Sequence, residues 1–207
     1  KALLDGVTDP VLRETVRDYL TNQQFRRDVF VKGAAPLPVT ALREAWLESR
    51  FALSNGRDDV PMKVRGSLGE ADLHADVYGP ILDALAGGPA TMRQLLASAP
   101  VAALGWNRLI EALTILVGSG QVQPCPPAKG DAKRLKGVRA FNQAVMRRAR
   151  DNADLGYLAS PVTGGGISVP RFSQLFLLAL SEGRKTAEDC AAYAWQVLSA
   201  QGQLIVK

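Results

Sequence analysis

The sequence predicts a mostly helical α+β fold built from small helix–strand modules. Apolar residues recur at the helical spacing i, i+3, i+4 and i+7 in most segments. Short apolar runs follow turns that contain glycine, a pattern typical of strands. A helix–glycine–strand junction also occurs twice, because Leu116-x-x-x-Gly120-Gln121-Val122 recurs as Leu198-x-x-x-Gly202-Gln203-Leu204.

The first 59 residues are predicted to be mainly helical. Thr8-Asp9-Pro10 marks a helix start, because a capping side chain precedes a proline in the first turn. A second helix spans residues 39–48, and residues 29–31 and 51–53 are strand candidates. The residues expected to face the core are Leu12, Val16, Tyr19 and Leu20 in the first helix, and Leu42, Ala45, Trp46 and Leu47 in the second.

Residues 60–127 are predicted to contain extended chain followed by three helices and a strand. The extended chain covers residues 60–73 and bends at Gly66 and Gly69. The helices span residues 77–86, 91–97 and 106–117, and residues 121–123 begin the strand. Their apolar positions are Ile81, Leu82, Leu85, Met92, Leu95, Leu96, Leu109, Ile110, Leu113, Leu116 and Val117. A helix, a short helix, a longer helix and a strand follow one another in this order in a winged-helix module.

The last third is predicted to repeat this order in a shorter form. Prolines and Gly130 form a linker, a basic helix covers residues 140–152, and residues 163–166 turn between strands at 157–159 and 167–169. Helices at 172–181 and 186–200 and a strand at 203–206 complete the chain. The residues expected to be buried are Phe141, Ala144, Val145 and Ala149 in the basic helix, and Ala187, Cys190, Ala191, Ala194, Val197 and Leu198 in the last. Trp46, Trp106 and Trp195 are also assigned to core packing.

These elements divide the chain into three expected regions. Residues 1–59 form an N-terminal helical segment, and residues 60–127 form a winged-helix-like module. Residues 128–207 combine the basic helix with a second winged-helix-like module. The fold class is therefore α+β and mostly helical, with two small winged-helix-like modules that carry short β-hairpins.

The residue types argue against a catalytic, cofactor or metal site within the chain. His74 is the single histidine, and its place before a helix favours a surface or helix-approach role. Cys125 and Cys190 lack metal-ligand spacing, and Cys190 is expected to be a buried thiol. Glycines 164–166 lie between two expected strands, so they predict a hairpin turn rather than a phosphate loop. We therefore predict no catalytic, cofactor-binding or metal-binding residue.

Positive charge is concentrated in residues 129–150. Eight basic residues and one acid give this stretch a charge of +7, while the whole chain carries +5. Three interpretations remain open: a solvated helix face, a contact with an acidic protein or another domain, and nucleic-acid binding. The candidate partner-binding residues are Lys133, Arg134, Lys136, Arg139, Arg147 and Arg148. The helices at 106–117 and 186–200 carry few bases, so nucleic acid is the less favoured partner.

Two further expectations concern location and completeness. No apolar run approaches the roughly 20 residues that cross a bilayer, and the cysteine usage fits a reducing compartment such as the cytoplasm. The chain begins with Lys1 rather than methionine, which suggests a fragment of a longer protein.

Two segments resemble one bacterial family. Residues 17–27, Arg-Asp-Tyr-Leu-Thr-Asn-Gln-Gln-Phe-Arg-Arg, are similar to the D-x-x-x-N-R-x-F-R segment of bacterial methyltransferases with a regulatory domain, a group that includes protein-lysine methyltransferases. Gln23 departs from the arginine that is common there. Residues 158–167, Leu-Ala-Ser-Pro-Val-Thr-Gly-Gly-Gly-Ile, follow a helix that opens with Phe141-Asn142 and resemble the C-terminal winged-helix region of that family.

The resemblance implies a modular protein. Such proteins carry a catalytic domain that depends on S-adenosylmethionine, then a regulatory segment, then a region like this one. No cofactor-binding residue carries over, because no matching glycine-rich motif occurs here. The implied partners are a protein substrate, the protein's own catalytic domain or a second copy in a homodimer. The alternative is a winged-helix regulator that binds DNA, and whether the whole protein is an enzyme stays open.

Overall fold

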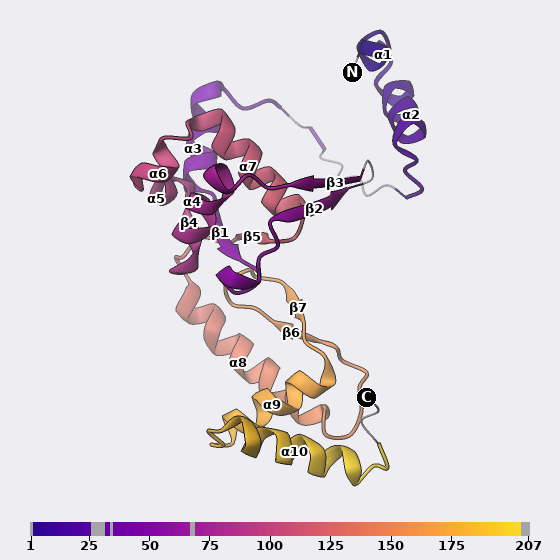
Figure 1. The fold of residues 1–207 in the computed structure, drawn as a ribbon, viewed down its shortest axis with the longest axis vertical. Coiled ribbons are helices and arrows are strands. Elements are labelled where there is room, and N and C mark those ends of the chain that lie inside the picture. Colours follow the sequence, from indigo (N-terminus) through magenta and orange to yellow (C-terminus); the bar gives the residue numbers. More distant parts are fainter. Residues whose placement is uncertain (1, 26–31, 34, 67–68, 204–207) are drawn as a thin grey trace. The chain divides into compact units, whose positions relative to one another are not determined.

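The computed structural model describes residues 2–25, 32–33, 35–66 and 69–203 (Figure 1). Helices predominate in this part of the chain and are joined by short antiparallel sheets, so the predicted mostly helical α+β class is confirmed. The chain divides into two compact units, residues 1–123 and residues 124–207.

The first unit contains seven α-helices, one 3₁₀ helix and five strands within the described ranges. In chain order they are α1 (Ala2–Asp5), α2 (Pro10–Thr21), α3 (Val39–Glu48), β1 (Arg50–Leu53), η1 (Arg57–Asp59), β2 (Lys63–Gly66), β3 (Gly69–Asp72), α4 (Ala75–Ala86), β4 (Ala90–Thr91), α5 (Met92–Leu96), α6 (Ala99–Ala102), α7 (Trp106–Gly118) and β5 (Val122–Cys125). The helices expected at 39–48, 77–86, 91–97 and 106–117 are confirmed, and so are the strands at 51–53 and 121–123.

Helix α2 begins where its sequence predicts but leaves its apolar stripe exposed. The Asp9 Oδ1 atom accepts a hydrogen bond from the Leu12 backbone N–H at 2.7 Å, which caps the first turn. Tyr19 is 85% exposed, Leu12 and Leu20 are also exposed, and Val16 is half-buried. The expected burial is therefore wrong, because an amphipathic stripe is buried only where another surface covers it. The strand expected at 29–31 lies outside the described residues.

Helix α3 packs on the core of the first unit with less of its surface than predicted. Leu42 and Ala45 are exposed, while Trp46 and Leu47 are half-buried and Trp46 contacts the core. The expected buried face is thus wrong for Leu42 and Ala45. The other side of α3 is bound through charge, because its two glutamates pair with Arg93 of α5 at 2.8 and 2.9 Å.

The core of the first unit lies between α4, α5, α7 and a three-stranded sheet. The strand order is β4–β1–β5, and β1 pairs antiparallel with β4 through Arg50↔Thr91 and Phe51↔Ala90. The predicted apolar positions Ile81, Leu82, Leu85, Met92, Leu95, Leu109, Leu113 and Leu116 are all buried, and Leu96, Ile110 and Val117 pack against them. Strand β1 comes from the expected N-terminal segment, so its residues share one sheet with the expected middle module.

The hairpin of β2 and β3 and the start of α5 also follow the sequence. Strands β2 and β3 pair antiparallel from Lys63↔Asp72 to Gly66↔Gly69, in the stretch predicted to be extended. Thr91 forms a capping box with Gln94, the pattern in which both side chains satisfy free backbone N–H groups. His74 is exposed at the N-cap of α4, as predicted.

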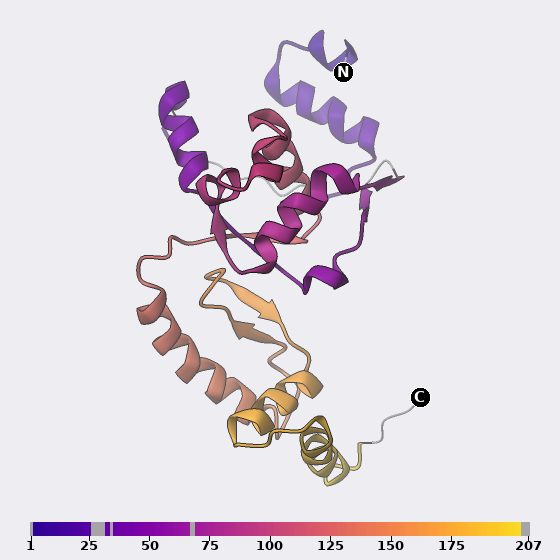
Figure 2. The ribbon, with the colours of Figure 1, turned by 60° about the vertical axis from the view of Figure 1, so that its left-hand side comes forward.

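The second unit packs a long helix beside a hairpin and a helix pair. Its elements are α8 (Asp131–Arg148), β6 (Tyr157–Ala159), β7 (Gly166–Ser168), α9 (Arg171–Ser181) and α10 (Ala187–Ser199). The hairpin lies beside α8 in both ribbon views (Figures 1 and 2), and β6 pairs antiparallel with β7 through Leu158↔Ile167. The two predicted strands with a turn between them are therefore confirmed.

Helix α8 begins nine residues earlier and ends four residues earlier than predicted. Gly130 precedes it with φ +98°, and Asp131 lies in its first turn, where a carboxylate interacts favourably with the helix dipole. Residues 131–139 are mostly alanine, lysine, arginine and leucine, which favour helices, and Gly137 costs only about 1 kcal/mol relative to alanine. The composition of the expected linker concealed this helical start.

The core of the second unit uses α8, α9 and α10 but not all the predicted residues. Val145, Ala149, Cys190, Ala194 and Leu198 are buried as expected, and Val197 packs against them. Phe141, Ala144, Ala187, Ala191 and Trp195 are exposed, so their predicted burial is wrong. Met146 and Tyr193 are buried in their place. The buried stripes are rotated because the neighbouring helices decide which side is covered.

The repeated junction found in the sequence has one local conformation in both copies. Gly120 and Gly202 have φ of +76° and +69°. Gln121 N–H donates to the Leu116 carbonyl at 2.9 Å, and Gln203 N–H donates to the Leu198 carbonyl at 3.0 Å. This six-residue hydrogen bond after a left-handed glycine is the Schellman end of a helix. The strand expected after the second copy falls almost wholly outside the described residues.

Candidate functional site

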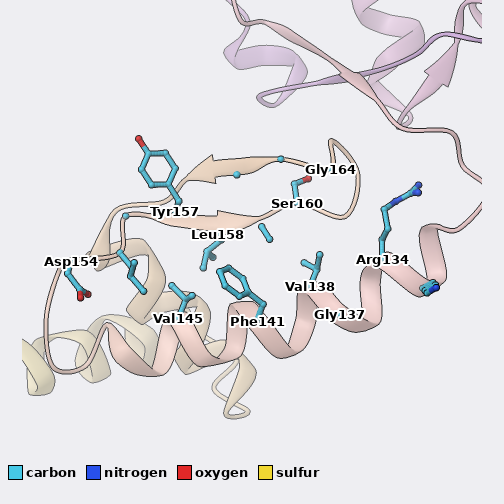
Figure 3. Close-up of a pocket in the computed structure, with 16 residues that line it drawn as sticks. Arg134, Gly137, Val138, Phe141, Val145, Asp154, Tyr157, Leu158, Ser160 and Gly164 are labelled. Atoms are coloured by element: carbon cyan, nitrogen blue, oxygen red, sulfur yellow. The ribbon is translucent and has the colours of Figure 1, made fainter.

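A groove runs between α8 and the β6–β7 hairpin in the second unit (Figure 3). It encloses about 870 Å³, a size within the usual range of ligand pockets. Its lining is mainly apolar. Helix α8 contributes Val138, Phe141 and Val145, and the hairpin side contributes Leu155 and Leu158.

A side-chain amide holds the hairpin against α8. The Asn142 Nδ2 atom donates to the Ala159 carbonyl at 2.9 Å, and the Ala159 N–H donates to Asn142 Oδ1 at 2.8 Å. Asn142 therefore pairs with β6 as a neighbouring strand would, using both halves of its amide. This pairing fixes β6 against α8 beside the groove.

A second buried amide fixes the hairpin to α9. The Gln174 side chain is 0% exposed, and its Nε2 atom donates to the Leu155 carbonyl at 2.6 Å and to the Val169 carbonyl at 2.8 Å. These carbonyls lie just before β6 and just after β7. Gln174 thus holds both strands at the base of the hairpin.

The turn of the hairpin is ordered by Ser160 and Gly164. The Ser160 Oγ atom accepts hydrogen bonds from the N–H groups of Val162 at 3.3 Å and Thr163 at 3.1 Å. Gly164 has φ +72°, and a Cβ atom there would lie 2.8 Å from Pro126 Cγ. The glycine run is therefore a structural turn, as its sequence predicts.

Arg171 completes the far end of α8. Its guanidinium donates to the carbonyls of Ala149 at 2.7 Å and Arg150 at 3.0 Å. Ala149 and Arg150 directly follow the last residue of α8, where the helix offers their carbonyls no N–H partner, so this contact satisfies them. Gln201 adds a hydrogen bond to the Arg150 carbonyl at 2.5 Å.

The six candidate basic residues divide into two groups. Arg134 donates to the Pro127 carbonyl at 2.6 Å and pairs with Asp131, while Arg148 pairs with Asp154 at 2.6 Å. These two arginines make contacts within the second unit, near the two ends of the groove. The other four are exposed and form no ion pair within the described ranges: Lys133, Lys136, Arg139 and Arg147.

The ion pair of Arg148 and Asp154 shifts the pKa of both groups. The hydrogen bonds from the Arg148 guanidinium hold the pKa of Asp154 below its ordinary value of 3.8. The same hydrogen bonds raise the pKa of Arg148. Both groups are exposed, so solvent weakens this interaction.

A separate polar cluster joins α8 to α10. Arg150 donates from Nε to the Tyr193 hydroxyl at 2.6 Å and pairs with Glu182. The hydrogen bond to Tyr193 is the main cause of the raised pKa of Arg150. Arg184 lies over the Tyr193 ring at 4.1 Å from its centre, a cation–π contact. Arg150 is therefore part of the packing of this unit.

Sequence reasoning missed Asn142, Gln174 and Arg171. Two of them left a signal, because asparagine is unusual in a helix interior and Gln174 stands in an otherwise apolar helix stripe. Cys190 is buried, as predicted. In the part of the chain that the structure describes, no three His, Cys, Asp or Glu side chains gather as a metal site would require.

Among the residues that the structure describes, no helix combines the length and the apolar character that a membrane crossing needs.

Comparisons with known proteins give one partial family match and one longer relative. A family model described as "Predicted methyltransferase regulatory domain" matches residues 1–32. The chain is 39% identical over 204 residues to an uncharacterized protein, sll1526, from Synechocystis sp.. The match covers 99% of this chain and 40% of that relative, so the chain spans about two fifths of its length. No solved structure matches the chain.

Proposed function

We propose that this chain is a non-catalytic regulatory region of a methyltransferase-like protein, and that it engages the catalytic domain or a protein substrate. The observation that carries the proposal is the match of residues 1–32 to a predicted methyltransferase regulatory domain. The similarity to a relative more than twice as long supports a modular protein in which the chemistry lies outside this region.

The structure of the matched residues supports a docking role. They include α1 and α2, and the apolar stripe of α2 is exposed at Leu12, Tyr19 and Leu20. An exposed apolar stripe on a helix is stabilised when a partner surface covers it. We assign this stripe to the contact with the rest of the methyltransferase-like protein.

The finer parts of the proposal concern fold, cofactor and location. The order α4, β4, α5, α6, α7 and β5 supports a winged-helix-like module in the first unit, although β1 rather than a following strand lies beside β5. The protein as a whole would use S-adenosylmethionine, would resemble protein-lysine methyltransferases and would act in the cytoplasm. A homodimer and a DNA-binding regulator are the alternatives. Helix α7 disfavours DNA, because Arg108 is accompanied by Glu111.

Calorimetry with S-adenosylmethionine tests where the cofactor binds. We expect no binding to this chain and micromolar binding to the full-length Synechocystis relative. Removing the region that matches this chain should leave cofactor binding intact and change the rate of methyl transfer. Saturable micromolar binding to this chain, or none to the full-length relative, would overturn the proposal.

The docking stripe has its own test with a matched control. The chain is added in trans to the part of the relative outside the match, and the dissociation constant is measured by anisotropy. Replacing Leu12 and Tyr19 by serine should weaken binding at least tenfold. The control Arg17→Ser lies on the opposite side of α2 and loses only an exposed pair with Glu14, so it should change binding less than twofold. Equal effects of both variants would contradict the assigned surface.

A further inference from the structure

We propose that the groove between α8 and the β6–β7 hairpin binds the apolar face of an acidic amphipathic helix from a partner protein. The groove lies in the second unit and shares no residue with the α2 stripe. The groove proposal therefore goes beyond the proposed regulatory function, and disproving it would leave that function standing.

The groove exposes large apolar side chains next to one another. Phe141 is 56% exposed and Leu155 is 46% exposed, although both line a concave surface. In Figure 3, Phe141, Val138 and Val145 extend from α8 towards the strand that carries Leu158. Apolar side chains that converge in a hollow and remain exposed gain stability when another apolar surface covers them.

The backbone of β6 disfavours an added strand as the occupant. Ser160 N–H donates to the Gly165 carbonyl and Val169 N–H donates to the Gly156 carbonyl, so alternate residues of the hairpin pair with each other. Ala159 turns its polar groups the other way, where Asn142 already binds both. A strand needs free groups along the edge, whereas a helix satisfies its own backbone. An apolar helix face is therefore the better fit.

The length of the groove suits about three helical turns. Its lining on α8 extends from Lys133 to Val145, which corresponds to about 18 Å at 1.5 Å per residue. A helix of this length presents apolar anchors at positions i, i+3, i+4 and i+7 to a groove. The partner segment is expected to carry four such anchors.

The charges around the groove select an acidic partner. Lys133 lines one end of it, is exposed and forms no ion pair among the residues described. Lys136 and Arg147 do not line the groove, because they lie about 120–140° around α8 from Phe141. Asp154 lines the other end but is neutralised by Arg148. A carboxylate on the flank of a bound helix would meet Lys133 at this end of the groove.

Binding of designed peptides tests the proposal. The probe is a fluorescein-labelled 14-residue helical peptide with leucine at i, i+3, i+4 and i+7 and glutamate on the flanks. One matched peptide has lysine in place of glutamate, and another has serine in place of leucine. We expect saturable micromolar binding of the first peptide to the full chain by anisotropy, and at least tenfold weaker binding of the other two.

Variants of the chain locate the binding surface. Phe141→Ser should weaken binding of the acidic peptide at least tenfold. Lys133→Glu should weaken this binding about fivefold and make it less dependent on salt concentration. The controls Trp195→Ser and Lys185→Glu change an exposed aromatic residue and an exposed lysine outside the groove, and they should change binding less than twofold. Circular dichroism verifies that each variant is folded.

Several results would overturn the proposal. These are absence of binding by the acidic peptide, equal binding of the lysine peptide, and equal effects of Phe141→Ser and Trp195→Ser. If duplex DNA displaces the acidic peptide at low salt, the occupant of the groove is nucleic acid and not a helix. Saturable binding of a small apolar dye, with no binding of the peptide, would identify a small-molecule pocket instead.

Discussion

The two units treat their longest amphipathic helices differently. In the first unit, α7 buries Leu109, Leu113 and Leu116 completely between α4, α5 and the sheet. In the second unit, α8 buries Val145 and Met146 near its C-terminal end but leaves Phe141 exposed in the groove. The first unit therefore relies on a closed apolar core, and the second keeps apolar surface accessible.

The second unit compensates for this smaller core with polar side chains. Asn142 and Gln174 attach the hairpin to α8 and α9, and Arg171 binds the two carbonyls that follow α8. A buried hydrogen bond has a modest net effect when formed but is costly to lose, since its partner is left unsatisfied. These contacts fix the hairpin against α8 and α9, beside the open apolar groove.

The largest expected contrast is between a core leucine and the groove phenylalanine. Leu113→Ala should lower the free energy of unfolding of the first unit by about 2–5 kcal/mol, because Leu113 is fully buried. Phe141→Ser should lower that of the second unit by about 1 kcal/mol, since half of its side chain is already in water. Hydrogen exchange of the α7 and α8 amides separates the two effects. Similar losses would show that Phe141 belongs to a closed core.

The next largest effect concerns the two hydrogen bonds between Asn142 and Ala159 in the second unit. Asn142→Ala removes both bonds to Ala159 and should lower the free energy of unfolding by about 1–3 kcal/mol. The neighbouring Gln143→Ala removes one 3.3 Å contact with Ser181 and should cost about 0.5 kcal/mol or less. Urea denaturation followed by circular dichroism measures both. Equal losses of free energy of unfolding in the two variants would show that Asn142 stabilises the fold no more than an ordinary surface contact does.

The smallest effect concerns pH at the end of the groove. The pKa of Asp154 is lowered in the folded protein, so its pair with Arg148 stabilises the fold above about pH 3.8. This contribution is lost as the pH falls from that value through the lowered pKa. Asp154→Asn should therefore lower the melting temperature at pH 6 and have no effect well below pH 3.8.

Asp58→Asn serves as the control for this pH dependence. Asp58 is exposed and takes part in no ion pair within the described ranges. Its replacement should leave the melting temperature unchanged at both pH values. If Asp154→Asn leaves the pH dependence of the melting temperature unchanged, the ion pair of Arg148 and Asp154 does not stabilise the fold.

Much of the secondary structure could be predicted from short-range patterns. Proline after Asp9 and the glycines of the two helix ends act within a few residues, and the structure confirms them. The start of α8 was mispredicted because prolines and Gly130 outweighed the helical residues that follow them. The groove could not be predicted, since its two walls are about 20 residues apart in the chain.

The sequence by itself determined the order of the longer helices, the α+β class and the local concentration of positive charge. The tertiary structure alone decided which residues of each apolar stripe are buried and which arginines are engaged. Arg134 and Arg148 bind within the unit, while Lys133 remains available at the groove. Helical spacing is a property of neighbouring residues, whereas burial and charge pairing depend on what packs against them, and that is set by distant parts of the chain.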